Sequence, residues 1–143
     1  MKSDSNYIKQ NAQHKEQPAN GNEQKTLSDI SKNIVERHLN SFVDNDLDGV
    51  MADYTNESVM ITQDATYTGI KEIRAFFIEL NVHFPKQKSS FELGKLVAKD
   101  DLVYIVWNAK TPSLHVPIGS DTFIIKDGKI SQQTFVGQLN FTS

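Results

Sequence analysis

The order of the periodic segments constrains the fold more than any other feature of this sequence. The C-terminal part holds four segments rich in Val, Ile, Phe, Thr and Tyr, which turn residues separate and which predict strands. The segments are Ser90–Lys99, Leu102–Thr111, His115–Lys126 and Lys129–Asn140. Asp127 and Gly128 give a strong hairpin signal between the last two. Helical periodicity precedes these strands, which favours an α+β domain with helices on one face of an antiparallel meander.

The segment before the meander predicts three helices and one short strand. Apolar residues recur every three or four positions from Leu27 to Val43, as they do along one face of a long amphipathic helix. Asp46 can cap a second, short helix. A strand is expected over Ser58–Thr62, and a third helix over Ile70–Leu80 after a turn around Asp64–Gly69.

Residues 1–25 are rich in Asn, Gln, Lys and Ser and hold few large apolar side chains. Such a segment buries too little surface to offset its ordering entropy, so we expect a flexible polar tail. A helix that forms only when the tail docks on a partner is the alternative. The folded domain is expected over residues 26–143. It begins at Thr26 or Ser28, because Thr26 and Asp29 have capping-box spacing.

Composition and spacing exclude several classes of function. The chain has no cysteine, which excludes disulfides, thiol catalysis and Cys-ligated zinc. Its net charge of −3 and the lack of a basic patch argue against nucleic-acid binding. His38, His83 and His115 lack the spacing of metal ligands, and no Gly-rich phosphate loop is present, so neither a metal nor another cofactor is expected. No segment resembles a membrane span or a secretory signal, so we expect a cytoplasmic protein without membrane contact.

Short motifs follow one another in a fixed order between residues 26 and 140. They are RHLN from Arg37, NDLDGV from Asn45, DY from Asp53, VMI from Val59, TG from Thr68, IRAFF from Ile73, DTFIIKDGKI from Asp121 and QTF from Gln133. This ordered set resembles the SnoaL-like (nuclear transport factor 2-like) superfamily, which also contains the bacterial ketosteroid isomerases. The resemblance implies a cone in which a strongly bent, mostly antiparallel sheet of cystatin-like type wraps three N-terminal helices. It also implies a pocket for a small apolar molecule at the open end, and a homodimer through the outer sheet face.

Asp121 is the first candidate for chemistry. Strand alternation places it on the same face as Phe123 and Ile125. By resemblance to the isomerases, an aspartic acid at this position stays protonated in an apolar site and donates a hydrogen bond to a developing oxyanion. If Asp121 faces the interior, desolvation should raise its pKa. Alternatively, Asp121 lies at the strand entrance, where solvent or a turn satisfies it.

His38 is the second candidate. It lies four residues after Ile34 and four before Phe42, on the apolar face of the first helix. The isomerases have a tyrosine at the corresponding position, which donates the second hydrogen bond to the oxyanion, and a histidine can donate or act as a base. The alternative is a core histidine that a backbone carbonyl satisfies.

The isomerase pattern is incomplete at its base. Counted without gaps from Asp46, the position of the proton-shuttling base falls on Thr62, which cannot abstract a proton at neutral pH. Asp64, two residues further on, is expected in the turn. Steroid isomerisation is therefore disfavoured, although a pair formed by His38 and Asp121 could perform acid/base work on another substrate.

Seven further side chains are expected to line the pocket. They are Tyr54, Met60, Thr62, Trp107, Phe123, Gln133 and Phe135. Trp107 could form a stacking wall for a ring-shaped ligand, or lie in the core or a dimer interface. Tyr104 lies on the opposite face of the same strand, so one of these two rings points inward and the other outward. For Tyr54 and Met60 the alternative is a place in the core.

Two hypotheses of function follow, and a third concerns the tail. The first is an isomerase, cyclase or lyase that uses His38 and Asp121 on a small apolar carbonyl compound. The second is a non-catalytic module that binds a small ligand or associates as a dimer, which the missing base at Thr62 favours. In the third, the tail over residues 1–25 docks another protein onto a dimeric platform.

Overall fold

The computed structural model describes residues 25–142. The tail predicted over residues 1–25 therefore lies outside the described residues, apart from Lys25. The helices are α2 (Leu27–Val43), α3 (Leu47–Met51) and α4 (Gly69–Val82). The strands are β1 (Val59–Thr62), β2 (Thr66–Thr68), β3 (Ser90–Lys99), β4 (Leu102–Lys110), β5 (Leu114–Lys126), β6 (Lys129–Gly137) and β7 (Asn140–Phe141).

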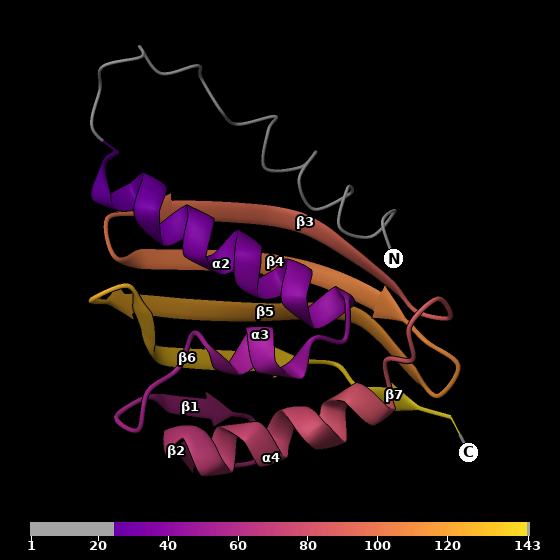
Figure 1. Cartoon of the computed structure of the whole chain (residues 1–143). Coiled ribbons are helices and arrows are strands. Elements are labelled where there is room, and N and C mark those ends of the chain that lie inside the picture. The colour runs from indigo at the N-terminus through magenta and orange to yellow at the C-terminus, as the bar shows by residue number, and fades with distance from the viewer. Residues whose placement is uncertain (1–24, 143) are drawn as a thin grey trace.

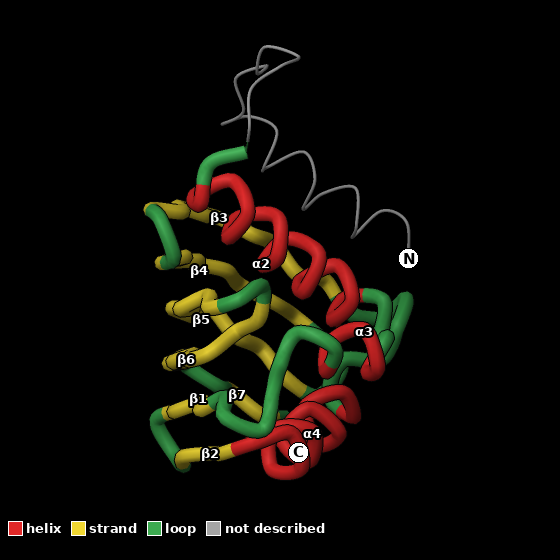
Figure 2. The backbone as a smooth tube through the Cα atoms, turned by 60° about the vertical axis from the view of Figure 1, so that its left-hand side comes forward, coloured by secondary structure: helices red, strands yellow, loops and turns green. Residues whose placement is uncertain are grey.

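The strands form one curved sheet in the order β2-β1-β6-β5-β4-β3, with the short β7 paired to β5. The meander β3-β4-β5-β6 is antiparallel throughout, which confirms the predicted order. The helices α2, α3 and α4 lie on one face of this sheet, and the sheet curves around them (Figure 1; Figure 2). The predicted α+β cone with a bent, mostly antiparallel sheet is confirmed.

The pairing at the sheet edges differs from the sequence prediction. β1 pairs with β6 in parallel and so extends the meander beyond its last strand. The segment predicted as a turn contains β2, which returns antiparallel to β1. The last predicted strand is two strands, because β6 ends at Gly137 and β7 pairs with Leu114 and His115 at the start of β5. Short strands whose partners lie far along the chain leave little periodic signal of their own.

The predicted starts of the first two helices are confirmed. Thr26 accepts the backbone N–H of Asp29, and the Asp29 carboxylate accepts the N–H of Thr26, which completes the capping box. Asp46 accepts the N–H of Gly49 at 3.0 Å and caps α3. These caps fix where each helix begins, and His38 comes to lie on the buried face of α2.

Bulges bend the strands beside the interior. β3 gains a residue opposite β4 between Leu93 and Lys95. β5 gains one opposite the stretch of β4 between Trp107 and Ala109. A bulge adds a residue to one strand and increases its local bend. The second bulge directly follows Trp107, so the sheet curves next to this side chain.

The interior of the cone is apolar, and its outer face is partly so. Fully buried side chains between helices and sheet include Val35, Val50, Met60, Ile73, Val103, Val116, Phe123 and Ile130. Strand residues whose side chains are exposed include Val97, Leu102, Tyr104, Ile118 and Val136. The homodimer expected through the outer face stays a prediction. No helix between residues 25 and 142 is long and apolar enough to cross a bilayer.

Candidate functional site

Two adjoining cavities lie between the helices and the sheet. The larger, of about 110 Å³, lies beside α4, and we call it the Thr62 chamber. The smaller, of about 60 Å³, lies between α2 and the sheet, and we call it the His38 chamber. Both are mainly apolar, and they share Phe77, Leu80, Phe84, Trp107 and Gln133. Together they suit a compound of about one six-membered ring, since an apolar cavity of ~150 Å³ binds benzene.

The predicted pocket residues divide between these chambers and the core. Those that line the His38 chamber are His38, Trp107, Asp121, Phe123 and Gln133. Those that line the Thr62 chamber are Thr62, Trp107, Gln133 and Phe135, and Asp64 of the turn joins them. Met60 lines neither chamber and belongs to the core, while Tyr54 is buried and reaches the site through hydrogen bonds. Between residues 25 and 142, no group of three His, Asp or Glu side chains is arranged to hold a metal ion.

Asp121 is a buried acid held by two donors. It is 8% exposed and faces inward with Phe123 and Ile125, as the strand alternation predicts, so it is not a solvated acid. Nε1 of Trp107 donates to Oδ1 at 2.8 Å, and Nε2 of Gln133 donates to Oδ2 at 2.9 Å. Burial raises the pKa of Asp121 from 3.8 to about 6, although both hydrogen bonds act to lower it.

Ring stacking holds Trp107 in place on the wall that the two chambers share. Its indole stacks on Phe91, with ring centroids 5.2 Å apart, and on Phe135, with centroids 5.8 Å apart. Gly119 of β5 pairs with Trp107, and a Cβ at Gly119 would come within 2.6 Å of the indole, so glycine leaves the ring its space. Tyr104 is exposed. Trp107 is therefore the inward-pointing ring of β4, and its N–H is aimed at the acid.

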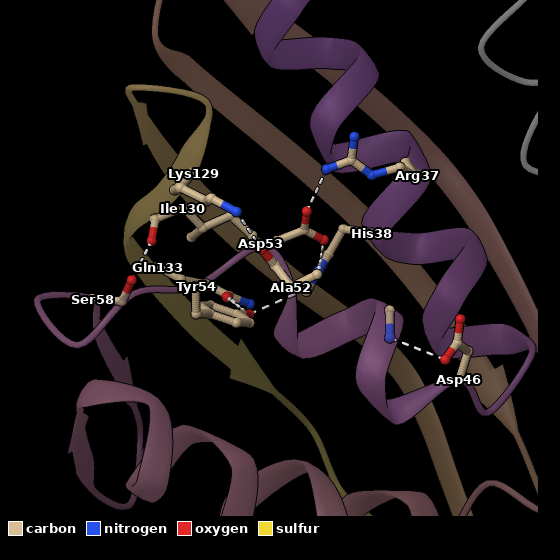
Figure 3. A network of polar contacts seen from close by, with 11 residues as sticks. Arg37, His38, Asp46, Ala52, Asp53, Tyr54, Ser58, Lys129, Ile130 and Gln133 are labelled. Atoms are coloured by element: carbon tan, nitrogen blue, oxygen red, sulfur yellow. Dashed lines mark hydrogen bonds and ion pairs between the residues drawn. The ribbon is translucent and has the colours of Figure 1, made fainter.

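Gln133, which donates to Asp121, continues the hydrogen bonds into the protein. Its partner there is Tyr54, as Figure 3 shows. The Tyr54 hydroxyl donates to Oε1 of Gln133 at 2.5 Å and lies 3.2 Å from Nε2 of His38. Burial raises the pKa of Tyr54 well above 10, and the charge of Asp121 adds to this shift, so Tyr54 keeps its hydrogen at neutral pH.

These hydrogen bonds end at Asp53, which forms an ion pair with Arg37 of α2. Nδ1 of His38 lies 3.0 Å from Oδ2 of Asp53, and the Arg37 guanidinium donates to Oδ1 (Figure 3). Both ring nitrogens of His38 therefore lie within hydrogen-bond distance of a side chain, Nδ1 of Asp53 and Nε2 of Tyr54. Burial alone would raise the pKa of Asp53, but the hydrogen bonds and charges of His38 and Arg37 outweigh it and lower this pKa. We call Arg37, His38, Asp53, Tyr54, Gln133 and Asp121 together the polar chain.

Asp53 and Arg37 are members of the site that the sequence prediction missed. Asp53 follows the short helix α3, where an acid resembles an ordinary loop residue. Its two partners lie 15 and 16 residues earlier, a separation that no helix or strand period links. The available signal was His38 on an apolar helix face, since a buried polar side chain requires a partner.

Trp107 gives a spectroscopic prediction, because it is the single tryptophan of the chain. Its N–H contacts Asp121, whose pKa of about 6 means that the charge beside the indole changes near this pH. We expect the tryptophan emission to shift with a midpoint near pH 6, and the Asp121→Asn variant to lack this transition. A pH profile that is the same in both proteins would show that Trp107 does not report the charge of Asp121.

Solved structures share this fold. A proposed ketosteroid isomerase from Kribbella flavida DSM 17836 matches with a TM-score of 0.68 at 12% identity, over 82% of this chain and 84% of that one. A proposed polyketide cyclase from Sinorhizobium meliloti gives 0.61 at 17% identity, over 72% of this chain and 93% of that one. An LEH-like epoxide hydrolase from M. tuberculosis matches with a TM-score of 0.60 at 17% identity, over 76% of this chain and 83% of that one. Similarity at these identities shows the fold alone, which is nuclear transport factor 2-like; no curated protein matches the chain by sequence.

The sequence itself carries the family assignment. The model of the SnoaL-like domain matches residues 35–133, a range that contains the whole polar chain. The chain therefore belongs to the SnoaL-like domain family, as the order of its motifs indicates. A shared fold and family leave the chemistry to be argued from the site.

Proposed function

We propose that this protein binds a small, mostly apolar carbonyl compound in the His38 chamber and moves a proton on it as an isomerase, cyclase or lyase. The observation that carries this proposal is the position of Asp121 and His38 on the wall of one apolar chamber. An acid and a histidine that line one mostly apolar pocket are residue types that commonly perform acid/base catalysis.

Asp121 has the properties of the base in this proposal. With a pKa of about 6 it is mostly ionised at neutral pH and is a stronger base than an ordinary carboxylate. It takes a proton from the carbon next to the carbonyl group. The electrons of that C–H bond form a carbon–carbon double bond, and the carbonyl oxygen becomes negatively charged. His38 lines the same chamber, and its ring is the polar group placed to stabilise this enolate.

The proposed role of Asp121 differs from the one that the isomerase resemblance implies. There the acid at this position stays protonated and a second carboxylate is the base. Here the position of that base is Thr62, and Asp121 is mostly a carboxylate at pH 7. Two solved structures that share the fold belong to a proposed isomerase and a proposed cyclase, which agrees with proton transfer next to a carbonyl group.

Hydrogen exchange on a simple ketone tests the proposal without knowledge of the natural substrate. Cyclohexanone is one six-membered ring, the size that the two adjoining chambers hold together. Its exchange of hydrogen for deuterium in deuterium oxide can be followed by NMR. We expect the protein to accelerate exchange by about a hundredfold over the Asp121→Leu variant, the lower end of the usual range for acid/base catalysis. Asp101→Asn is the matched control, because Asp101 is an exposed acid in a turn. Equal rates with Asp121→Leu and the unsubstituted protein would contradict a base at Asp121.

Non-catalytic ligand binding is the second candidate, and one observation favours it. Both carboxylate oxygens of Asp121 and both ring nitrogens of His38 already have partners within the protein. A binding module would keep these partners when a ligand enters. It would then bind cyclohexanone, seen as a change in Trp107 emission, without any acceleration of hydrogen exchange.

A further inference from the structure

Aromatic side chains are the largest group in the lining of the Thr62 chamber. They are Tyr67, Phe76, Phe77, Phe84, Trp107 and Phe135. The face of an aromatic ring carries partial negative charge, so a wall made of rings attracts positive charge as well as apolar groups. A wall of aliphatic side chains has no such preference.

Packing fixes four of these rings in two pairs. The Tyr67 ring of β2 packs on Phe76 of α4, with ring centroids 5.1 Å apart, and Phe135 of β6 stacks on Trp107 of β4. Trp107 also stacks on Phe91, so its faces are already occupied. Tyr67, Phe76 and Phe135 line the Thr62 chamber alone, and we expect these three rings to contact a positively charged ligand there.

Asp64 is the single acid that lines this chamber. It is exposed and lies in the turn between β1 and β2, where its backbone N–H donates to Thr62. Its carboxylate forms no hydrogen bond or ion pair with any other residue between 25 and 142. No Lys, Arg or His of the same described range lines the chamber. The chamber therefore offers a negative charge and aromatic rings, with no positive charge among the lining residues to oppose a cation.

The acid of the adjoining His38 chamber differs from Asp64 in its partners. Trp107 donates to one oxygen of Asp121 and Gln133 donates to the other, so the protein itself satisfies this carboxyl group. Asp64 has no such donors. A cation that enters the two chambers therefore finds its open counter-charge at Asp64.

We propose that the Thr62 chamber binds an organic ammonium group, held by its aromatic side chains and by the charge of Asp64. Aromatic rings are the groups by which proteins commonly recognise quaternary ammonium ions. Because the His38 chamber is the proposed place of the carbonyl group, the ligand is an amino ketone with its two polar groups at opposite ends. The inference rests on the proposed function for the place of the carbonyl group.

Two ketones of nearly identical shape separate the effect of charge from that of size. One is the N,N-dimethylpiperidinium ion with a ketone opposite its nitrogen, which we call the cationic ketone. Its charge is permanent, because the nitrogen carries four carbon substituents. The other is dimethylcyclohexanone with both methyl groups opposite the ketone, which we call the neutral ketone. Each contains one six-membered ring, the size that the two chambers hold together.

The affinities of both ketones test the inference, measured by calorimetry and by the emission of Trp107, which lines both chambers. We expect the cationic ketone to bind about tenfold more tightly than the neutral one. Asp64→Asn should weaken binding of the cationic ketone about threefold, as expected for an exposed charge, and should leave the neutral one unchanged. Asp101→Asn removes an exposed acid from another turn, so it is the matched control and should change neither affinity.

Tyr67→Leu tests the aromatic rings separately from the acid. Leucine keeps an apolar side chain but has no ring, so the cationic ketone should bind about threefold more weakly while the neutral ketone changes little. Tyr67→Phe keeps the ring and should retain the affinity. If Tyr67→Leu does not fold, Phe135→Leu gives the same comparison at another ring of the chamber.

Nuclear Overhauser effects locate the ammonium group directly. The N-methyl hydrogens of the cationic ketone should contact the ring of Tyr67, which lines only the Thr62 chamber. Stronger contacts with Phe123, which lines only the His38 chamber, would place the cation beside Asp121 and overturn the assignment.

Two affinity results would also overturn the inference. One is a neutral ketone that binds as tightly as the cationic ketone or more tightly. The other is an equal effect of Asp64→Asn and Asp101→Asn, which would reflect the net charge of the protein alone. The test reads binding and not turnover, so a failed exchange experiment on cyclohexanone would leave a preference for the cation standing. A missing preference for the cation would likewise leave exchange by Asp121 standing.

Discussion

Asp121→Asn is expected to stabilise the protein at pH 7.5 by up to about 3 kcal/mol. Burial raises the pKa of Asp121 from 3.8 to about 6, so the folded protein holds the proton more tightly than the unfolded chain does. The cost of the buried carboxylate is therefore absent below about pH 4, grows between about pH 4 and pH 6, and is complete above that. Asparagine never carries this charge, and it can still accept from Trp107.

Urea unfolding of both proteins at about pH 7.5 and about pH 4 measures the effect. The difference in free energy of unfolding should be large at the higher pH and should nearly vanish at the lower one. The control is Asp101→Asn, which removes an exposed acid and should change stability by less than about 0.5 kcal/mol at either pH. An Asp121→Asn protein that is less stable than the unsubstituted one at pH 7.5 would contradict a buried carboxylate with a raised pKa.

A residue that destabilises its own fold near neutral pH is itself an argument for function. Folding alone would favour a neutral side chain at position 121, because the acid costs free energy there. Functional sites are where such costs are retained, since activity often requires a charge that stability does not. The same substitution should therefore raise stability and abolish proton transfer.

Asp53→Ala is expected to have the second large effect, a loss of about 3 kcal/mol of folding free energy. The carboxylate accepts from both Arg37 and His38 and is almost fully buried. Alanine leaves Nδ1 of the buried His38 without its partner in an apolar surrounding. Its other partner, Arg37, loses less, because 63% of its side chain is exposed to water.

The direction of the pH dependence follows from the lowered pKa of Asp53. The stabilisation by this carboxylate is complete above the ordinary aspartate pKa and is lost as the pH falls through the lower value of the folded state. Chemical unfolding of Asp53→Ala, Asp53→Asn and Arg37→Gln at neutral pH measures the contributions. Arg37→Gln is the matched control and should cost no more than about 1 kcal/mol, as expected for an exposed partner. An Asp53→Ala protein as stable as Arg37→Gln would show that Asp53 does not hold His38.

Much of the fold could be predicted because it is encoded locally. The spacing of Thr26 and Asp29 is sufficient for a capping box, and alternation alone places Asp121 on the same face as Phe123, which the structure shows to be the inner one. The parallel pairing of β1 with β6 could not be predicted in the same way. It depends on where the meander ends in space and not on any period within Val59–Thr62.

The residues of the candidate site were easier to predict than the hydrogen bonds that link them. His38 and Asp121 were expected in one pocket, and they line one chamber. The bonds that link them pass through Tyr54 and Gln133, which lie 79 residues apart in the sequence. Asp53 was missed because an acid beyond a short helix is usually exposed, and only the packing of α2 against it makes it buried.

The titration of the Asp121 carboxyl group is the most direct test of this site. Carbon-13 NMR of the side-chain carboxyl carbons, with Asp121→Asn to assign the signal, measures its pKa in the ligand-free protein. We predict a value of about 6, which corresponds to a buried acid on the wall of an apolar chamber. A value at or below the ordinary 3.8 would mean that Asp121 is solvated or firmly ion-paired, and would contradict its role as the base.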